Sequence, residues 1–308
     1  MGSVMVAQWD ALHVGRKRPP VPESQRSAGS PTVRRRELGA LLRSLRTERG
    51  LTVEQVAGEL LCSPSKVSRL ETGQRGATPR DVRDLCALYG VTDAAEREHL
   101  MTLAREGKQQ GWWQSFSVPL QHMIYVGLEQ EAASLSVFQS SVVPGLVQTA
   151  DYTRALHERA VPRLEDSAIE ERVKERSTRQ QILARDNPPR LEIIIDEAVL
   201  HRPMGGPFVM REQLNWLLEE SERPDLTIQV LLYDVGAHPA LESNFTVLEF
   251  AGQAPTVIYA ESLAGPMYIE RQQEVEHYLL VLEALRGMAL SPRDSARLVA
   301  KVRDAYTG

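Results

Sequence analysis

The sequence lacks an apolar run long enough to cross a membrane, for which about 18 consecutive apolar residues are needed. Asp10 and His13 interrupt the only mildly apolar stretch near the N-terminus, so no signal peptide is predicted. Hydrophobic residues make up 42% and charged residues 25% of the 308 positions, as is usual for globular proteins. We therefore expect a cytoplasmic protein with no membrane partner.

Cysteine is also scarce. The two cysteines, Cys62 and Cys86, have no close metal-ligand spacing, and thiols stay reduced in the cytoplasm. We expect both to be unpaired thiols that act as small core residues, and we predict no metal site.

The common catalytic and phosphate-binding motifs are missing as well. The sequence contains no H-E-x-x-H, G-x-S-x-G, P-loop or G-x-G-x-x-G pattern. Five residues invite a metal or acid–base interpretation without forming a tight motif, and we interpret them as structural: Asp196, Glu197, His201, His238 and Glu242. We expect no enzyme activity, no catalytic residue and no cofactor.

Charge is distributed unevenly along the chain, whose net charge is −5. Residues 33–91 carry 11 Lys and Arg against 7 Asp and Glu, and residues 1–32 carry 4 against 2. The remainder therefore has a net charge of −11. A polyanion, if one binds, is expected to bind the basic front of the chain.

The basic front begins with a segment poor in apolar residues and continues as predicted helices. Residues 1–32 are rich in Pro, Ser, Gly and basic residues, which predicts a disordered tail. From Val33 onward, apolar residues recur at helical spacing. N-cap and stop signals predict five helices: residues 33–49, a second after Thr52, a third after Ser63, a fourth after Thr78 and a fifth over 93–106.

The third predicted helix lies within "LLCSPSKVSRLETG", residues 60–73. Val67 and Leu70 are expected to hold it to the core, while its polar residues face solvent near a helix N-terminus that favours phosphate. Two short helices joined so tightly place the second one in a protruding position, as in a helix-turn-helix that enters the DNA major groove. The candidate DNA-binding residues are Gln55, Ser63, Pro64, Ser65, Lys66, Ser68, Arg69, Gln74 and Arg75.

Each candidate also has a structural alternative. Arg69 would be an ordinary surface arginine if it paired with Glu71 or Glu54, and Gln55 would act only as a helix cap. The alternative for Gln74 and Arg75 is an ordinary loop that makes no contact with phosphate. We interpret Glu71 as structural, tying the helix end to the following loop, rather than as a reader of cytosine.

Residues 36–91 resemble the five-helix DNA-binding domain of the XRE family, which is related to the phage lambda and 434 repressors and Cro. The motif S-x-x-x-V-S-R-L-E-x-G over residues 63–73 carries the resemblance. It implies an all-α, lambda-repressor-like DNA-binding domain. The family often has Gln directly after the helix-two Thr, where this chain has Val53.

The rest of the chain alternates predicted strands and helices. Strand–helix–strand order over residues 190–234 predicts a parallel crossover, and a hairpin over 244–262 makes the expected sheet mixed. Expected strands are 135–139, 190–196, 226–234, 244–250 and 255–262, and expected helices start near 150 and cover 167–183, 207–222, 270–287 and 292–306. The predicted fold is thus multi-domain, with an α+β domain after the helical one.

This organisation predicts three parts: a tail over residues 1–32, a helix-turn-helix domain over 33–108 and an α/β domain over 109–308 that regulates, dimerises or binds a partner. Trp112 and Trp113 lie at the junction, where paired aromatics usually join two domains. A sensor pocket between the sheet and its helices is compatible with this fold. Nothing in the sequence identifies its ligand.

Stretches such as "YVGLEQEAASLSVFQSSVVPGLVQT" and "VIYAESLAGPMYIE" resemble a domain that follows XRE modules in actinobacterial regulators. That group is described as antitoxin-like, and the resemblance covers about residues 112–303. It implies a small partner protein encoded by a neighbouring gene.

Two functions remain open. The first is a sequence-specific DNA-binding transcriptional regulator that binds double-stranded DNA as a homodimer on a pseudo-palindromic operator. The second is an antitoxin-like protein whose α/β domain binds the small partner, with DNA binding serving autoregulation. An enzyme with a DNA-targeting module is disfavoured by the missing motifs.

Overall fold

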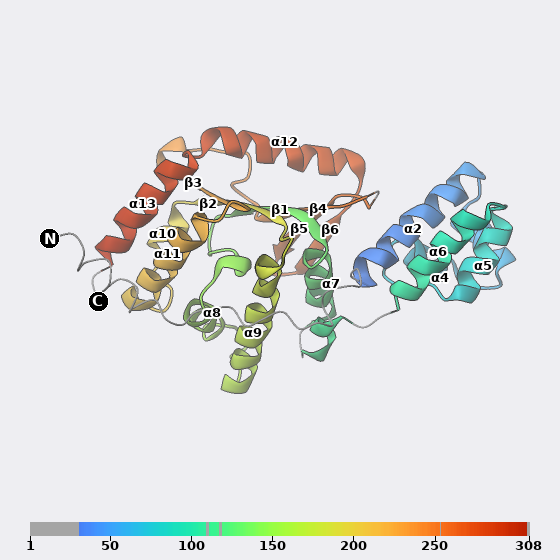
Figure 1. The fold of residues 1–308 in the computed structure, drawn as a ribbon, viewed down its shortest axis with the longest axis horizontal. Coiled ribbons are helices and arrows are strands. Elements are labelled where there is room, and N and C mark those ends of the chain that lie inside the picture. The colour runs from blue at the N-terminus through green and yellow to red at the C-terminus, as the bar shows by residue number, and fades with distance from the viewer. Residues whose placement is uncertain (1–30, 109–110, 117–118, 253, 307–308) are drawn as a thin grey trace.

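The computed structural model describes residues 31–108, 111–116, 119–252 and 254–306 (Figure 1). The predicted disordered tail therefore falls mainly outside the described residues. Its last two residues correct the prediction, because Pro31 begins a helix and both Pro31 and Thr32 are buried. Proline is favoured at the first helical position, where its missing N–H is not needed.

Five helices make up the N-terminal domain, as predicted: α2 (Pro31–Glu48), α3 (Val53–Glu59), α4 (Pro64–Glu71), α5 (Pro79–Leu88) and α6 (Ala94–Glu106). The predicted N-caps form, since the side chains of Thr52, Ser63, Thr78 and Asp93 each accept a backbone N–H. Cys86 is buried in the core of this domain and Cys62 packs at its edge, both as free thiols.

Helices α2 and α4 approach each other closely at Gly39. A Cβ atom at this position would lie 2.5 Å from the Glu71 carbonyl oxygen, so only glycine allows the contact. Beside it, the Arg46 guanidinium makes a two-point ion pair with the Glu71 carboxylate, at 2.6 and 3.0 Å. The end of α4 is therefore fixed to α2 by both packing and charge.

The C-terminal domain, called the body below, contains one sheet with helices on both faces. Its strands are β1 (Ala132–Gln139), β2 (Arg190–Asp196), β3 (Leu226–Leu231), β4 (Phe245–Phe250), β5 (Val257–Ser262) and β6 (Gly265–Ile269). Its α-helices are α7 (Leu120–Glu129), α8 (Ala150–His157), α9 (Asp166–Arg179), α10 (Ala198–His201), α11 (Pro207–Ser221), α12 (Gln272–Met288) and α13 (Pro292–Ala305). Short 3-10 turns are η2 (Trp112–Ser115), η3 (Gly145–Val147), η4 (Gln180–Ala184) and η5 (Tyr233–Val235).

The strand order is β3-β2-β1-β4-β5-β6, and the sheet is mixed, as predicted. Strands β1, β2 and β3 run parallel, whereas β4, β5 and β6 form antiparallel pairs that include the expected hairpin. The strand predicted over 226–234 ends at Leu231 because η5 follows it.

Strand β6 was not predicted. Its sequence begins with Gly265 and Pro266, which favour a turn, but proline is tolerated in an edge strand because it needs no ladder N–H there.

The two faces of the sheet bury different side chains. Val137 points toward the core shared with α11 and the segment before α8, whereas its neighbour Phe138 points toward the core formed with α12. Figure 1 shows α7, α8 and α9 on one side of the sheet and α12 across the other.

Helix α2 also belongs to the body. Val33 packs in the body's core with Tyr125 and Leu128, although Leu38 and Leu42 pack in the core of the helical domain. Gly127 in α7 makes this possible, because a Cβ there would lie 2.4 Å from the Thr32 hydroxyl.

The junction contains the predicted pair of tryptophans. Trp113 is buried, and the same Cβ at Gly127 would lie 3.0 Å from its ring. Trp112 packs edge-on against it, with ring centroids 5.9 Å apart. Trp113 therefore helps to join the domains, as expected from the sequence.

A row of aromatic rings continues from the body to α2. The rings of Tyr125 and Tyr259 lie 4.1 Å apart and those of Tyr259 and Tyr268 lie 5.4 Å apart. The Arg36 guanidinium of α2 lies 5.2 Å from the centre of the Tyr268 ring and pairs with Glu270 at 2.6 Å.

The close contact at Gly39 predicts that Gly39→Ala lowers the free energy of unfolding by about 1–3 kcal/mol, because α2 and α4 must separate. Gly58→Ala is a matched control, since nothing lies within 4 Å of a Cβ at that position. It should raise stability by about 0.5–1 kcal/mol through helix propensity. Urea unfolding followed by far-ultraviolet circular dichroism measures both, and an unchanged Gly39→Ala protein would refute the packing argument.

Candidate functional site

Helix α4 presents a polar face to solvent. Val67 and Leu70 are buried, while Ser65, Ser68 and Arg69 are exposed. The helix begins at Pro64 after the N-cap Ser63, whose hydroxyl accepts the Lys66 N–H at 3.2 Å. A helix that is held by two apolar residues and is otherwise exposed at its start can enter a DNA groove.

The turn between α3 and α4 contains an unusual residue. Leu61 has a φ of 50°, in the left-handed region that favours glycine, and its side chain is 95% exposed. A large apolar side chain therefore stands on the surface next to the start of α4. Glycine would relieve the backbone strain, but would remove this exposed side chain.

The nine predicted DNA-binding residues lie on α4, in the segments directly before and after it and, for Gln55, on the preceding helix α3. Eight of them are exposed: Gln55, Ser63, Pro64, Ser65, Ser68, Arg69, Gln74 and Arg75. Lys66 differs, because it is half-buried and its ammonium contacts the Asp81 carboxylate at 2.6 Å. Its charge is therefore already partnered within the protein.

Gln55 has a definite structural use. Its side-chain oxygen accepts the Thr52 N–H at 2.8 Å, which completes the capping box expected from the sequence. The structural alternative for Gln55 is thus realised in this geometry.

Arg69 does not adopt its structural alternative. Glu71 is occupied by Arg46, and within the described residues the Arg69 guanidinium makes no ion pair. Glu71 is structural, as predicted, but it ties α4 to α2 rather than to the following loop. Arg46 also donates to the Leu51 carbonyl at 2.7 Å, so this pair fixes the start of α3 as well.

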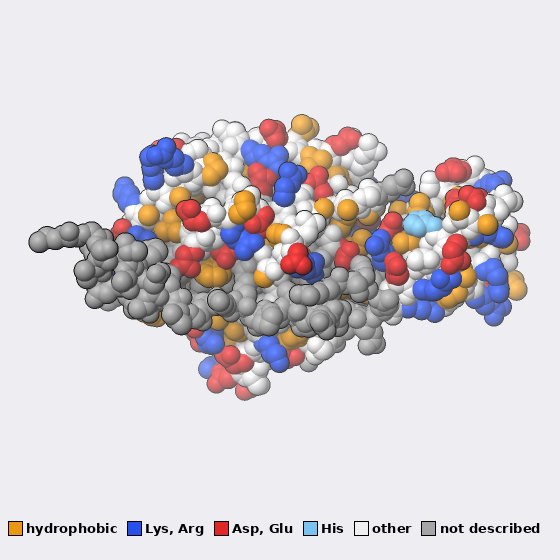
Figure 2. All heavy atoms as spheres, in the orientation of Figure 1, with side chains coloured by type: hydrophobic (Ala, Val, Ile, Leu, Met, Phe, Trp, Pro, Cys, Tyr) orange, Lys and Arg blue, Asp and Glu red, His pale blue; other side chains and the backbone are white. Residues whose placement is uncertain are grey.

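Figure 2 shows Lys and Arg side chains gathered along the lower edge of the helical domain in that view, whereas the visible face of the body mixes both signs. The basic edge agrees with the net positive charge of residues 33–91 in the sequence. A positive edge of this kind attracts a polyanion through long-range electrostatics.

Most of the acidic and histidine residues that the sequence singled out in the body have structural contacts. Asp196 accepts the Ala198 N–H at 2.8 Å, and Glu197 accepts the Tyr233 N–H at 3.0 Å. His201 lies 3.5 Å from Glu197, and His238 accepts the Ala240 N–H. Glu242 is exposed on the loop before β4. Among the described residues, no group of three or more His, Cys, Asp and Glu could hold a metal ion.

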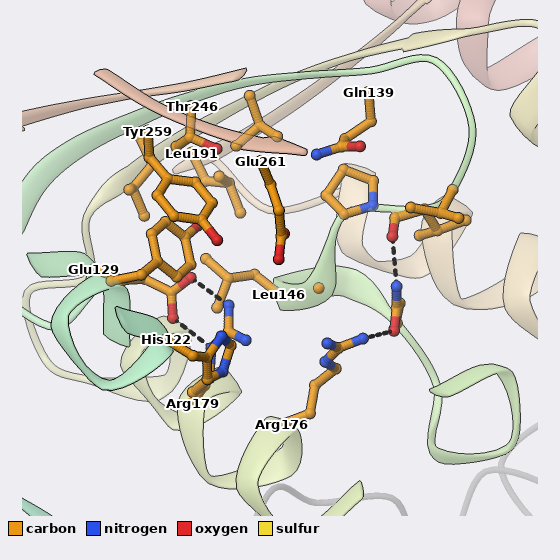
Figure 3. Close-up of a pocket in the computed structure, with 18 of the residues that line it drawn as sticks. His122, Glu129, Gln139, Leu146, Arg176, Arg179, Leu191, Thr246, Tyr259 and Glu261 are labelled. Atoms are coloured by element: carbon orange, nitrogen blue, oxygen red, sulfur yellow. Dashed lines mark hydrogen bonds and ion pairs between the residues drawn. The ribbon is translucent and has the colours of Figure 1, made fainter. Parts of the chain in front are cut away.

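The body contains a cavity between the sheet and its helices, lined in part by charged side chains that were not among the predicted site residues (Figure 3). At its side, the buried carboxylate of Glu129 makes a two-point ion pair with Arg179, at 2.8 and 2.7 Å. Glu175 lies 3.8 Å from Arg179 and 3.1 Å from His122. Although burial opposes ionisation, Arg179 and His122 lower the pKa of Glu175 to about 2.

A second arginine, Arg176, lines the same cavity. Its guanidinium donates to the Gln148 amide oxygen, and its Nε atom is buried with no hydrogen-bond partner in the described structure. Burial and the neighbouring Arg179 lower the pKa of Arg176 to about 10. Burial and Arg176, in that order, also lower the pKa of the nearby His157 to about 4.

The periodicity of α9 contained a signal for these residues. Its first half is strongly charged, which suggests a solvated helix, but Ile169 and Val173 lie on one face. Continuing that face by three residues reaches Arg176, and three more reach Arg179. The face that starts apolar therefore ends with two inward-facing arginines.

Comparison with known families identifies both parts of the chain. Residues 37–100 match a family described as a helix-turn-helix domain. Residues 123–301 match a family described as a domain of unknown function (DUF5753). No curated protein and no solved structure matches the chain. Within the part of the chain that the structure describes, no helix has both the length and the apolar character required to span a membrane.

The lowered pKa of His157 predicts a pH dependence of stability. Below its ordinary value near 6.5, the unfolded chain binds a proton at His157, whereas the folded protein does so only near 4. The free energy of unfolding should therefore fall as the pH is lowered from 7 to 5, and His157→Gln should make this fall shallower. Chemical unfolding at several pH values tests it, with the exposed His99→Gln as control. Equal slopes for wild type and His157→Gln would contradict it.

Proposed function

The chain belongs to the family defined by the DUF5753 domain, and we propose that it is a sequence-specific transcriptional regulator that reads DNA with helix α4. Its helix-turn-helix domain indicates a DNA-binding regulator. The family description gives no function for the body, so the proposal starts from the helical domain. The observation that carries it is the exposed polar face of α4, with Arg69 unpaired among the described residues.

The contacts support a different proposed role for each group of candidate residues. Arg69 combines an exposed guanidinium with a rigid helix fixed to α2, which suits two-point recognition of a guanine edge. Ser65 and Ser68 are exposed near it and suit either base or phosphate contacts. Gln74 and Arg75 follow the helix and suit the phosphate backbone.

Four other candidates have supporting roles in this proposal. Ser63 and Pro64 start α4 and so orient its N-terminus toward a phosphate. Lys66, paired with Asp81, adds positive charge with little freedom to reach a base. Gln55 contributes chiefly as the cap of α3.

If Arg69 reads a base, Arg69→Ala should weaken binding to the operator by about 1–3 kcal/mol and relax specificity at one base pair. The matched control is Arg105→Ala, which removes an exposed arginine that pairs with Glu98 on α6. Fluorescence anisotropy over a salt series measures the affinity for the DNA upstream of the gene and the affinity for a scrambled duplex, and their ratio gives the specificity. An equal loss on both duplexes would make Arg69 a phosphate contact and refute base reading.

We also propose that the protein acts as a homodimer on a pseudo-palindromic operator. One α4 helix covers only a half-site, and dimers place two such helices about 34 Å apart, one turn of DNA. The body is large enough to supply the dimer contact, since DNA binding by the helical domain leaves the body's surface free for it.

The alternative proposal is that the body binds a small partner protein, with DNA binding serving autoregulation, as in an antitoxin. The acidic composition outside the first 91 residues favours a basic partner. In this alternative, a neighbouring gene encodes the small partner.

The mass of the complex separates the two proposals. For the homodimer, analytical ultracentrifugation with operator DNA should give two chains of 34.5 kDa per duplex. Protein purified from the native host should then contain this chain alone. A single chain on the operator would rule out the dimer, and a second small protein at fixed stoichiometry would support the alternative.

We propose, finally, that the protein has no enzyme activity. In support, the acidic and histidine residues of the body that invite a catalytic interpretation are mostly engaged in structural contacts, as Asp196 and Glu197 illustrate. No catalytic residue or cofactor enters the proposal.

A further inference from the structure

The body contains a cavity of about 180 Å³ between the sheet, α7, α9 and the segment around η3. Water occupies about 30 Å³ per molecule, so the space holds several waters or one small organic molecule. Figure 3 shows the side chains that converge on it from these elements. Apolar side chains such as Leu135, Val137 and Leu146 form part of the wall, and Tyr259 forms another part.

Arg176 is the polar group with unused bonding capacity in this cavity. The neighbouring Arg179 is satisfied by the two-point pair with Glu129. By contrast, Arg176 contacts the neutral amide of Gln148, makes no ion pair among the described residues, and has a buried Nε without a partner. A buried N–H without an acceptor raises the free energy of the folded protein. A hydrogen bond from this guanidinium to an anion is therefore more favourable than the same bond in water.

Residue 145 is a glycine, so no side chain at this position comes between its backbone and the arginines of α9. A Cβ atom at Gly145 would lie 3.6 Å from Arg176 Nε and 3.5 Å from Arg179 Nη2. Two guanidinium groups therefore converge on one point that no side chain fills. A carboxylate matches such a planar guanidinium in size and geometry.

The opposite wall carries a negative group. Glu261 extends into the cavity from the end of β5, facing Arg176 on α9 (Figure 3). The two form no direct ion pair in the described structure, although the Glu261 charge acts on Arg176. Glu261 is an exposed residue of β5, two positions after the buried Tyr259 on the same strand. A bound molecule would thus lie between a cation on one side and an anion on the other.

We propose that this cavity binds a small zwitterion, an amino acid or a close derivative, with its carboxylate on Arg176 and its amino group at Glu261. The apolar wall accommodates a side chain of modest size. A dianion such as phosphate fits less well, because Glu261 would repel it.

The first test is a thermal-shift screen of the purified full-length chain, without DNA, against each of the common L-amino acids. At least one should raise the unfolding temperature, since a ligand that binds only the folded state stabilises it. For the strongest, calorimetric titration should give a dissociation constant, and the matched amine without the carboxylate and the acid without the amino group should each bind at least tenfold more weakly.

Variants assign the two ends of the ligand. Arg176→Gln and Glu261→Gln should each weaken binding about tenfold or more, whereas the exposed Arg211→Gln should leave it unchanged. Gly145→Ala keeps every charge and meets both guanidinium groups only at ordinary contact distance, yet its methyl group narrows the space that a carboxylate needs beside them. It should fold normally and bind more weakly, which keeps the test valid if Arg176→Gln fails to fold.

Three results would overturn the proposal. They are the absence of stabilisation by any amino acid, unchanged affinity in folded Gly145→Ala and Glu261→Gln proteins, and equal affinity for an amino acid and its analogue without the amino group. Because the measurements use no DNA, they are independent of the function proposed for α4.

Discussion

Packing of the first turn of α2 against α7 holds the two domains together. Val33 enters the body's core, Thr32 occupies the space left by Gly127, and Trp113 closes the contact. Later turns of the same helix, which rises about 1.5 Å per residue, form part of the other core. Because a helix is stiff over this length, the direction of the helical domain relative to the body is set where α2 starts.

Two arginine–glutamate pairs stabilise the structure, whereas two other arginines have no carboxylate partner within the described residues. Arg46 with Glu71 fixes α4 to α2, and Arg179 with Glu129 fixes α9 to α7. Each pair is largely shielded from water, so removal of one partner would leave an uncompensated charge. Arg69 lies on α4 and Arg176 on α9, and within the described residues neither makes an ion pair with a carboxylate. The paired residues thus fix the positions of α4 and α9, the two helices that carry the unpaired arginines.

Local signals allowed much of the fold to be predicted. N-caps such as Thr52 and Ser63 act within a few residues, and they located the helices around α4 correctly. The mixed sheet could also be predicted, because the strand–helix–strand order and the hairpin each involve segments that are consecutive in the sequence. Strand β6 could not be predicted, because its pairing with β5 outweighs the turn tendency of Gly265 and Pro266.

The site residues also divide into those that a local sequence pattern predicts and those that depend on contacts between distant segments. Exposure of Arg69 follows from the local helix pattern, but the engagement of Lys66 by Asp81 depends on how α4 meets α5, fifteen residues later. The cavity required contacts among α7, α9 and four strands, so the inward face of α9 alone did not reveal it.

The shared helix limits the modularity of this protein. The body determines the residues at the start of α2, and the helical domain determines those from Leu38 onward, so a natural boundary between the two would fall inside a continuous helix. Exchange of whole DNA-binding modules between relatives would have to preserve both the register of α2 and the glycine of α7 that receives it. Substitution on the exposed face of α4 avoids that constraint, which makes point mutation the easier evolutionary route to a new operator.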